Sequence, residues 1–470
     1  MSTAPAAAHG PSSAPAAPTA SGSLPPPVTR ILARHLAAAR YEDLQADVRH
    51  EGLRTFLNWL GCAVGSARHE AVSIAIDALG PFSGPAQAGI LGRTERMDVL
   101  HAALINGISS HVFDFDDTHL KTVIHPAGPV ASAILALAEL KPVSGRDFLN
   151  ALILGIDVEC RIGNAVYPDH YHVGWHITGT TGVFGAAAAA GKLLGLDEQQ
   201  MVWALGLAAT QPVGLREMFG TMTKSFHPGR AAQNGLTAAL LAQRGYTSSE
   251  QGIEAKRGWA NVTSTHRNYD EITGDLGGRN EILLNSYKPF ACGIVIHPAI
   301  DGCVQLRNEH GLVAEEIDRI ALKVHPLVLE LTGKKTPKTG LDGKFSVYHS
   351  AAVAIIDGRG GEPQYSDERV RDPQVVALRD RVTAEIDPAM PADAVAVTVT
   401  LKDGRVLQKR VDHAIGSVAR PMTDRDLEAK FTDLVQPVHG GAGAAALQRA
   451  CWDLESMADA GDIARMAQTR

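Results

Sequence analysis

The chain has 470 residues, of which 45% are hydrophobic and 20% are charged, and its formal net charge is −7. This composition is typical of a soluble globular protein with two or three domains. The acidic balance and the absence of a long Lys/Arg block argue against nucleic acid or an anionic membrane surface as the main partner.

The N-terminal residues 1–27 are rich in Ala, Pro and Ser and contain no Lys or Arg. They resemble neither a secretory signal nor an Arg-rich transit peptide, so we predict a disordered tail. Apolar stretches such as residues 127–138 are too short to cross a bilayer. The five cysteines lack CxxC spacing and indicate neither a disulfide framework nor a zinc site. We therefore expect a soluble protein of the cytoplasm.

Helical periodicity dominates from about residue 29 to residue 261, where apolar residues recur at spacings of three and four. Ser144 with Asp147 predicts the start of one helix, and Asp197 with Gln200 predicts the start of another, because each pair has the spacing of a capping box. These patterns predict an all-α domain.

The pattern changes after about residue 275. Residues 316–324 and 394–401 alternate apolar and polar side chains as strands do, and Asp403-Gly404 predicts a hairpin turn into a third strand at residues 406–411. Thr423 and Asp426 then form another capping box, which predicts terminal helices that pack back onto the first domain. We predict a mainly α fold, with an all-α domain (residues 28–272 and 415–470) and a smaller α+β domain (residues 273–414).

Four segments are unusually rich in polar groups and each precedes a predicted helix; they are residues 111–128, 167–176, 214–230 and 288–297. Helix starts present unpaired N–H groups and the positive end of the helix dipole, which favour bound anions. Cationic side chains accompany these segments, among them Arg216, Lys224, Arg230 and Lys288. The sequence has no P-loop and no GxGxxG fingerprint, so a pocket for carboxylates is favoured over one for phosphates.

Several short motifs in these segments resemble those of one known family. They are Asp114-Phe-Asp-Asp-Thr118 followed by His125-Pro126, Gly174-Trp-His176 with Thr178-Gly-Thr-Thr-Gly182, Lys224-Ser-Phe-His227, and Lys288-Pro-Phe290. In order and spacing they are similar to the MmgE/PrpD family, which contains 2-methylcitrate dehydratase, cis-aconitate decarboxylase and an iminodisuccinate epimerase. The resemblance spans roughly residues 28–434.

This resemblance implies a large helical domain, a smaller α+β lid domain, a homodimer, and an active site between the domains without metal or organic cofactor. The residues on the family's active-site positions are Asp114, Thr118, His125, His176 and Lys224, with Lys288 on a further polar position. Two departures separate the chain from the decarboxylase. Gly293 stands where that enzyme has a histidine, with His297 only farther on, and His349 beside Tyr348 stands where it has a tyrosine.

The chemistry of such a site explains its residue types. Removing a proton alpha to a carboxylate creates an enediolate, so the base must lie beside cations and hydrogen-bond donors. We predict that Asp114, His125 and His176 share proton transfer and that Lys224 stabilises the developing negative charge. The predicted substrate-binding residues are Thr118, Arg216, His227, Arg230, Lys288, Tyr348 and His349. Asp116 and Asp117 are predicted to be structural.

The leading hypothesis is a cofactor-independent carbon–oxygen lyase that dehydrates 2-methylcitrate or a close analogue. Epimerisation of an imino- or amino-dicarboxylate and decarboxylation of cis-aconitate are alternatives at the same site. A silent polycarboxylate-binding protein is a further alternative. A metal-dependent hydratase using His172 and His176 is disfavoured, because Gly174 and Trp175 between them depart from the HExxH pattern.

Overall fold

The computed structural model describes residues 26–469, so the predicted tail lies outside the described residues except for Pro26 and Pro27. The predicted mainly α fold is confirmed. We call the following elements the helical part: α1 (Val28–Ala38), α2 (Ala46–Gly65), α3 (Glu70–Leu79), α4 (Val99–Val112), α5 (Ala127–Leu140), α6 (Gly145–Val166), α7 (Asp169–His172), α8 (Ile177–Leu194), α9 (Glu198–Ala209), α10 (Thr223–Gln243), α11 (Trp259–Thr263), α12 (Asp270–Thr273), α19 (Asp424–Trp452) and α20 (Gly461–Met466).

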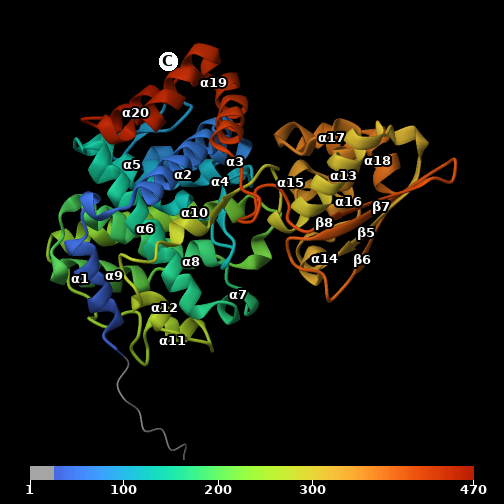
Figure 1. Ribbon diagram of the computed structural model, residues 1–470. Coiled ribbons are helices and arrows are strands. Elements are labelled where there is room, and N and C mark those ends of the chain that lie inside the picture. The colour runs from blue at the N-terminus through green and yellow to red at the C-terminus, as the bar shows by residue number, and fades with distance from the viewer. Residues whose placement is uncertain (1–25, 470) are drawn as a thin grey trace, which may run out of the picture.

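The remaining long elements form what we call the sheet part: α13 (His297–His310), β5 (Ile317–Val324), α14 (Pro326–Thr332), α15 (Gly340–Gly343), α16 (Val347–Asp357), α17 (Asp367–Arg371), α18 (Pro373–Arg379), β6 (Val382–Ile386), β7 (Val395–Leu401) and β8 (Val406–Val411). Figure 1 shows the two parts side by side. Two short ladders complete the described strands: β1 (Ala88–Gly89) with β2 (Arg96–Met97), and β3 (Asp117–His119) with β4 (Asn285–Tyr287).

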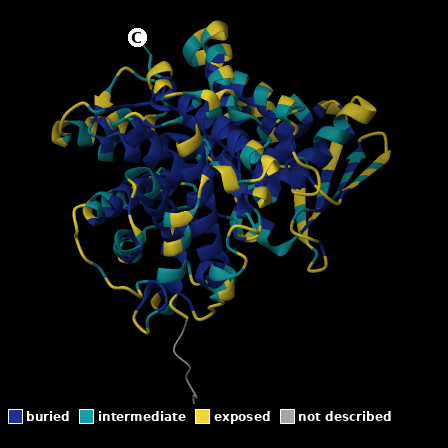
Figure 2. Cartoon of the chain, turned by 60° about the vertical axis from the view of Figure 1, so that its left-hand side comes forward, coloured by how far each residue is buried: buried dark blue, intermediate teal, exposed yellow. Residues whose placement is uncertain are grey.

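The predicted helix starts are confirmed by side-chain caps. Ser144 accepts a hydrogen bond from the backbone N–H of Asp147 at the start of α6. Asp197 and Gln200 form a capping box at the start of α9. Such caps satisfy N–H groups that the first helical turn leaves without partners. The helices pack around α8, which is buried over most of its length and contacts α5, α6 and α10, as the dark interior in Figure 2 shows.

Helices α4 and α10 cross at a pair of glycines. A Cβ atom built on Gly107 would lie 2.5 Å from the Cα atom of Gly229, and one on Gly229 would lie 2.3 Å from the carbonyl oxygen of Leu104. No other residue type fits at this crossing without displacing a helix. The contact fixes the C-terminal end of α4 against the first turns of α10, where predicted site residues lie.

The sheet part contains a four-stranded sheet in the order β6-β5-β7-β8. The predicted strands are confirmed, and the turn between β7 and β8 contains Gly404 with a φ of 90°. In β7, alternate residues from Val395 to Leu401 are buried, as expected for a sheet with one covered face. Helices α13 and α16 cover that face, and Figure 1 shows them beside the strands.

The chain returns to the helical part through α19, where Thr423 and Asp426 form the predicted capping box. Phe431 and Val435 of α19 share a hydrophobic core with Phe56 and Leu60 of α2. The helix runs to Trp452 and changes direction at Gly440, whose φ is 70°. The domain boundaries themselves stay a prediction.

No helix within residues 26–469 combines the length and the apolar character that crossing a membrane requires. All five cysteines are buried free thiols. Burial raises the pKa of Cys62 and Cys303 to about 12. These thiols are therefore protonated near neutral pH and are poor nucleophiles.

Candidate active site

The β3–β4 ladder brings two distant segments of the predicted site together. Thr118 pairs with Ser286 in antiparallel register, which places Lys288, just after β4, beside the loop that follows α4. The ammonium group of Lys288 donates to Asp114 Oδ1 at 2.6 Å and to the Asp114 carbonyl oxygen at 3.2 Å. Asp114 has a φ of 51°, a left-handed conformation that costs free energy for a residue other than glycine and is often found at functional sites.

Lys224 approaches the same carboxylate from the other side of the site. It lies in the first turn of α10 and donates to Asp114 Oδ1 at 2.8 Å. Helix α10 begins at Thr223 and contains Pro228, so the prediction that segment 214–230 precedes its helix is wrong. This early start places Lys224 at the helix end where the dipole is positive.

Two ammonium groups and the Asp114 carboxylate interact strongly at the centre of this cluster. Burial alone would raise the pKa of the Asp114 carboxyl, but the ammonium groups of Lys224 and Lys288 hold it well below its usual range. Burial lowers the pKa of Lys224, whereas Asp114 keeps the pKa of Lys288 above its usual value against the effect of burial. Two buried ammonium groups therefore share the Asp114 carboxylate, and the N–H donors that Asp114 does not use can bind a substrate carboxylate.

His125 is held in one orientation and one tautomer. Its Nδ1 atom lies 2.8 Å from the carbonyl oxygen of Asp117, and because a carbonyl only accepts, Nδ1 carries the proton. Its backbone N–H donates to the hydroxyl of Thr178 at 3.0 Å. Nε2 is then the basic nitrogen. Burial lowers the pKa of His125 well below its usual value, so the ring is neutral near pH 7, the protonation state that a general base requires.

His176 occupies the N-cap position of α8, two residues after Gly174. Its backbone N–H donates to the carbonyl of Gly214 at 3.1 Å, and its Nδ1 lies 2.8 Å from Nδ1 of His227. One of these two nitrogens donates and the other accepts. Burial lowers the pKa of both rings, to about 4 for His227 and well below the usual value for His176.

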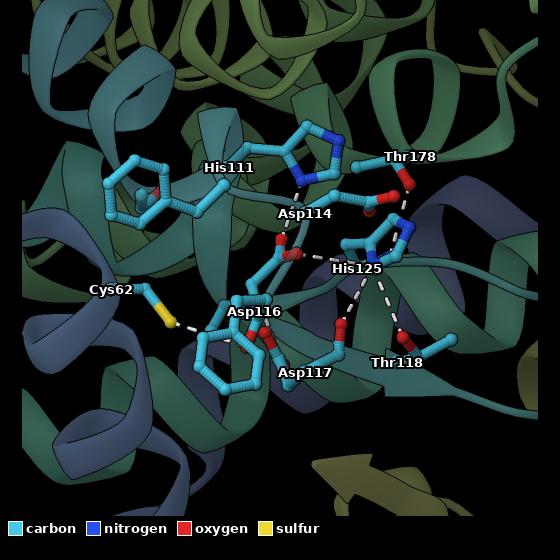
Figure 3. Close-up of polar contacts among 12 residues, drawn as sticks. Cys62, His111, Asp114, Asp116, Asp117, Thr118, His125 and Thr178 are labelled. Carbon is cyan, nitrogen blue, oxygen red and sulfur yellow. Dashed lines mark hydrogen bonds and ion pairs between the residues drawn. The ribbon is translucent and has the colours of Figure 1, made fainter. Parts of the chain in front are cut away.

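His111 belongs to this cluster although the sequence analysis did not single it out. Its Nδ1 lies 2.6 Å from Asp116 Oδ2, and Asp116 Oδ1 lies 3.7 Å from Nδ1 of His125. Figure 3 shows Asp116 between the two imidazoles. Burial alone would raise the pKa of Asp116, but these two rings hold it well below its usual value. The signal that could have identified His111 is its position one helical turn before Asp114.

Asp117 has the structural role predicted for it. Its carboxylate accepts from the backbone N–H of Ala127 at 3.1 Å and from the side-chain amide of Asn285 at 2.8 Å. It thus caps the start of α5 and ties that helix to β4. Burial, followed by the charge of Asp116, raises the pKa of Asp117 to about 7.

A group of three histidines could also hold a metal ion. One ligand atom from each of His111, His125 and His176 lies within 4.8 Å of the others. Three neutral imidazoles are a set that Zn²⁺ accepts. The pairing of His172 with His176 considered from the sequence is wrong, because His172 ends α7 whereas His176 caps α8. The two residues therefore do not share a helix face.

The candidate site opens into a cavity of about 70 Å³ where the two parts of the chain meet. The predicted residues that line it are Asp114, Thr118, His125, His176, Lys224 and Lys288. The structure thus brings together all the candidate catalytic residues and two of the predicted binding residues.

Five predicted binding residues do not line this cavity. His227 is buried behind His176, and Arg230 is exposed on α10, where it donates to Gln233. Arg216 donates to Glu330 at 2.8 Å and stacks on the ring of Tyr171. It therefore contacts a residue of the cavity wall without lining the cavity itself.

The predicted binding residues Tyr348 and His349 also do not line the cavity. Both lie in the first turn of α16, which begins at Val347. Tyr348 is packed in the hydrophobic core of the sheet part. His349 is fully buried and donates through Nε2 to the Gln364 carbonyl at 2.8 Å. Arg216 and Arg230 were predicted from their charge, and Tyr348 and His349 from the family resemblance. Neither property indicates which way a side chain points.

The pH dependence of stability tests whether His349 is buried and neutral in the folded protein. Burial lowers its pKa to about 4, whereas an unfolded histidine titrates near about 6.5. Between these values the unfolded state binds more protons than the native state, so His349 lowers stability as the pH falls. Relative to wild type, we expect His349→Gln to gain about 2 kcal/mol in the free energy of unfolding between pH 7 and pH 5, measured by denaturant titration.

The exposed His310 provides the matched control. His310→Gln should keep the same stability difference from wild type at both pH values. A His349→Gln variant whose difference from wild type is also constant with pH would contradict the neutral, buried state of this ring.

Comparison with known proteins adds an independent finding. Residues 30–272 match the family model of the MmgE/PrpD N-terminal domain, and residues 290–455 match that of the MmgE/PrpD C-terminal domain. Cis-aconitate decarboxylase from Aspergillus terreus is 28% identical over 429 residues, which cover 84% of this chain and 87% of that protein. The Homo sapiens cis-aconitate decarboxylase is 28% identical, with 86% and 87% covered. The 2-methylcitrate dehydratase from Cupriavidus necator is 26% identical, with 81% and 84% covered.

Proposed function

Because the chain belongs to the MmgE/PrpD family, we propose that it is a cofactor-independent lyase that removes a proton alpha to a carboxylate of a citrate-like polycarboxylate. Dehydration of 2-methylcitrate or a close analogue is the proposed reaction. The observation that carries the proposal is the pair of buried ammonium groups of Lys224 and Lys288 on one carboxylate, beside neutral His125 and His176 in the same cavity. A homodimer and a cytoplasmic location stay predictions.

His125 is the proposed base. Its Nδ1–H is held by the Asp117 carbonyl, so Nε2 accepts the proton from carbon. The imidazolium that forms lies near the carboxylate of Asp116, 3.7 Å from Nδ1, which stabilises the charged ring. The same proton then passes to the departing hydroxyl group, which leaves as water while the carbon–carbon double bond forms. His176, across the cluster, is proposed to hold that hydroxyl group.

Lys224 and Lys288 are proposed to bind the carboxylate next to the reacting carbon. Negative charge moves onto that carboxylate when the proton leaves, and fixed ammonium groups in a buried site stabilise it strongly. Asp114 has a different role from the shared proton transfer predicted from the sequence. Both ammonium groups donate to its Oδ1 atom, so it is proposed to hold the two lysines in place.

The test follows substrate hydrogens in deuterated water. The protein is incubated with methylcitrate, citrate, cis-aconitate, tartrate and iminodisuccinate, and each sample is followed by NMR. We expect deuterium at the carbon alpha to a carboxylate and new alkene signals from a hydroxy acid of the citrate type. Ligand-dependent thermal stabilisation without exchange or product would instead identify a binding protein, and exchange that yields only a stereoisomer would identify an epimerase.

Decarboxylation of cis-aconitate is a second candidate, because several relatives carry that name. It would start from the same cavity but break a carbon–carbon bond, with loss of a carboxylate as CO₂. Gly293 lines the cavity where the resemblance places a histidine in the decarboxylase, so this chain offers no imidazole there. Carbon dioxide release from cis-aconitate in the same experiment would favour this candidate over dehydration.

A metal-assisted lyase is a third candidate, favoured by the grouping of His111, His125 and His176. The charges near the three rings act in both directions. After burial, Lys224 contributes to the lowered pKa of all three rings, whereas Asp116 raises the pKa of His111 and His125. Elemental analysis and turnover after exhaustive chelation distinguish a metal-assisted lyase from a cofactor-independent one. Full activity without bound metal would exclude the metal-assisted reaction.

A further inference from the structure

The cavity of the candidate site has an apolar wall that the chemistry above does not use. Beside the ammonium and imidazole groups it is lined by Phe219, Ile294, Val295, Leu327, Leu331 and Phe345. Citrate presents carboxylates and a hydroxyl group in every direction, and a carboxylate placed against such a wall would lose hydration without gaining a partner. An apolar substituent would gain free energy there because it leaves water.

A second cavity of about 470 Å³ extends from this wall. The residues that line both cavities are Val123, Tyr167, Ile294, Val295 and Leu327. The catalytic cavity is much smaller, about 70 Å³. The two cavities therefore adjoin along a shared apolar border.

The second cavity offers little that would hold another charged group. Apolar residues that line it but not the catalytic cavity include Leu120, Pro298, Ala414 and Ile415. Its ionisable side chains are His297, Asp393 and His413. Asp393 and His413 pair with each other at 2.6 Å, and burial lowers the pKa of His297 to about 3, so that ring is neutral. The occupant that fits is hydrocarbon.

We propose that the substrate carries an unbranched alkyl chain longer than methyl, and that the second cavity holds this chain. The inference rests on the proposed function in one respect, because it places the acid end of the substrate among Lys224, Lys288 and His125. It names a substrate class, polycarboxylates with an alkyl chain on the carbon skeleton.

A homologous series of substrates tests the proposal. Turnover of 2-alkylcitrates with methyl, ethyl, butyl and hexyl chains is measured by appearance of the alkene. Burial of each methylene is expected to raise kcat/KM by about fourfold, so the hexyl compound should exceed the methyl compound by more than 100-fold. Equal kcat/KM across the series, or a maximum at methyl, would overturn the inference and leave the proposed function standing.

Binding is measured separately with 2-alkylsuccinates of the same chain lengths, by calorimetry. Kd is expected to fall about fourfold per methylene, whether or not the protein turns over any citrate. A Kd that does not change with chain length would overturn the inference. Tighter binding with chain length but no exchange or product from any alkylcitrate would support the inference and refute the proposed function.

A substitution that fills the second cavity tests whether this cavity holds the alkyl chain of the ligand. Ala419 is exposed and lines only the second cavity, so Ala419→Trp should fold and narrow it. Wild type should bind 2-hexylsuccinate more tightly than 2-methylsuccinate, and we expect the ratio of these two affinities (1/Kd) to fall by at least tenfold in the variant. Ala389→Trp, at an exposed position that lines neither cavity, is the matched control and should keep the ratio. An unchanged ratio in Ala419→Trp would overturn the assignment of the chain to this cavity.

Discussion

Replacing Lys224 with methionine is expected to lower kcat/KM for the true substrate by about 10²–10³-fold, the usual loss when one fixed donor to a developing negative charge is removed. Methionine keeps much of the side chain's length but removes the ammonium that donates to Asp114 at 2.8 Å. Asp114 retains its bond to Lys288 at 2.6 Å, so the buried carboxylate keeps one cation. The loss should therefore appear in kcat and in binding while the fold is preserved.

Steady-state kinetics with the substrate identified by NMR, together with a thermal melt, measure this effect. The exposed Lys256 supplies a control, because Lys256→Met removes the same charge from the surface. The control should match wild type in both measurements. If Lys224→Met stayed within a few-fold of wild type, the proposed role of the ammonium in charge stabilisation would be wrong.

Replacing His125 with glutamine is expected to lower kcat by about 10²–10⁴-fold, the contribution typical of a positioned general base. The glutamine amide can still donate toward the Asp117 carbonyl, which His125 reaches at 2.8 Å, but it cannot accept a proton from carbon. Substrate binding should change little, because the two lysines remain. The decisive measurement is the rate of deuterium incorporation, which reports proton removal whatever product follows.

His310→Gln, at an exposed position on α13, controls for the general effect of the substitution. It should exchange substrate hydrogens at the wild-type rate. Exchange in His125→Gln at a rate close to wild type would show that another group removes the proton, and His176 would be the next base to examine.

The sequence predicted the helices and strands well where the pattern is local. Capping pairs such as Ser144 with Asp147, and the alternation along residues 394–401, depend on neighbours a few positions away, and the structure confirms both. The start of α10 was missed because Pro228 and Gly229 resemble a helix start, although the helix already begins at Thr223. Pro228 lies in the second turn, so the carbonyl of Lys224 lacks its usual helical hydrogen bond.

The site was harder to predict, because it depends on contacts between distant segments. The ladder that joins Thr118 to Ser286 spans three residues per strand, too few for an alternating pattern to be visible. His111 was overlooked because it ends an apolar helix, where a histidine is usually a packing residue. Arg216 was predicted to bind substrate on charge alone, whereas in the structure its guanidinium pairs with Glu330 and stacks on Tyr171.

The cavity draws most of its polar lining and much of its apolar lining from different stretches of the chain. Asp114, His125, His176 and Lys224 all precede residue 230, whereas Leu327 and Phe345 come from the sheet part. The exceptions include Lys288 among the polar residues and Phe219 among the apolar ones. Reactivity and selectivity are thus encoded in partly separate portions of the gene. Natural variation or laboratory recombination confined to the later portion can retarget the protein to new acids while the inherited proton-moving apparatus stays intact.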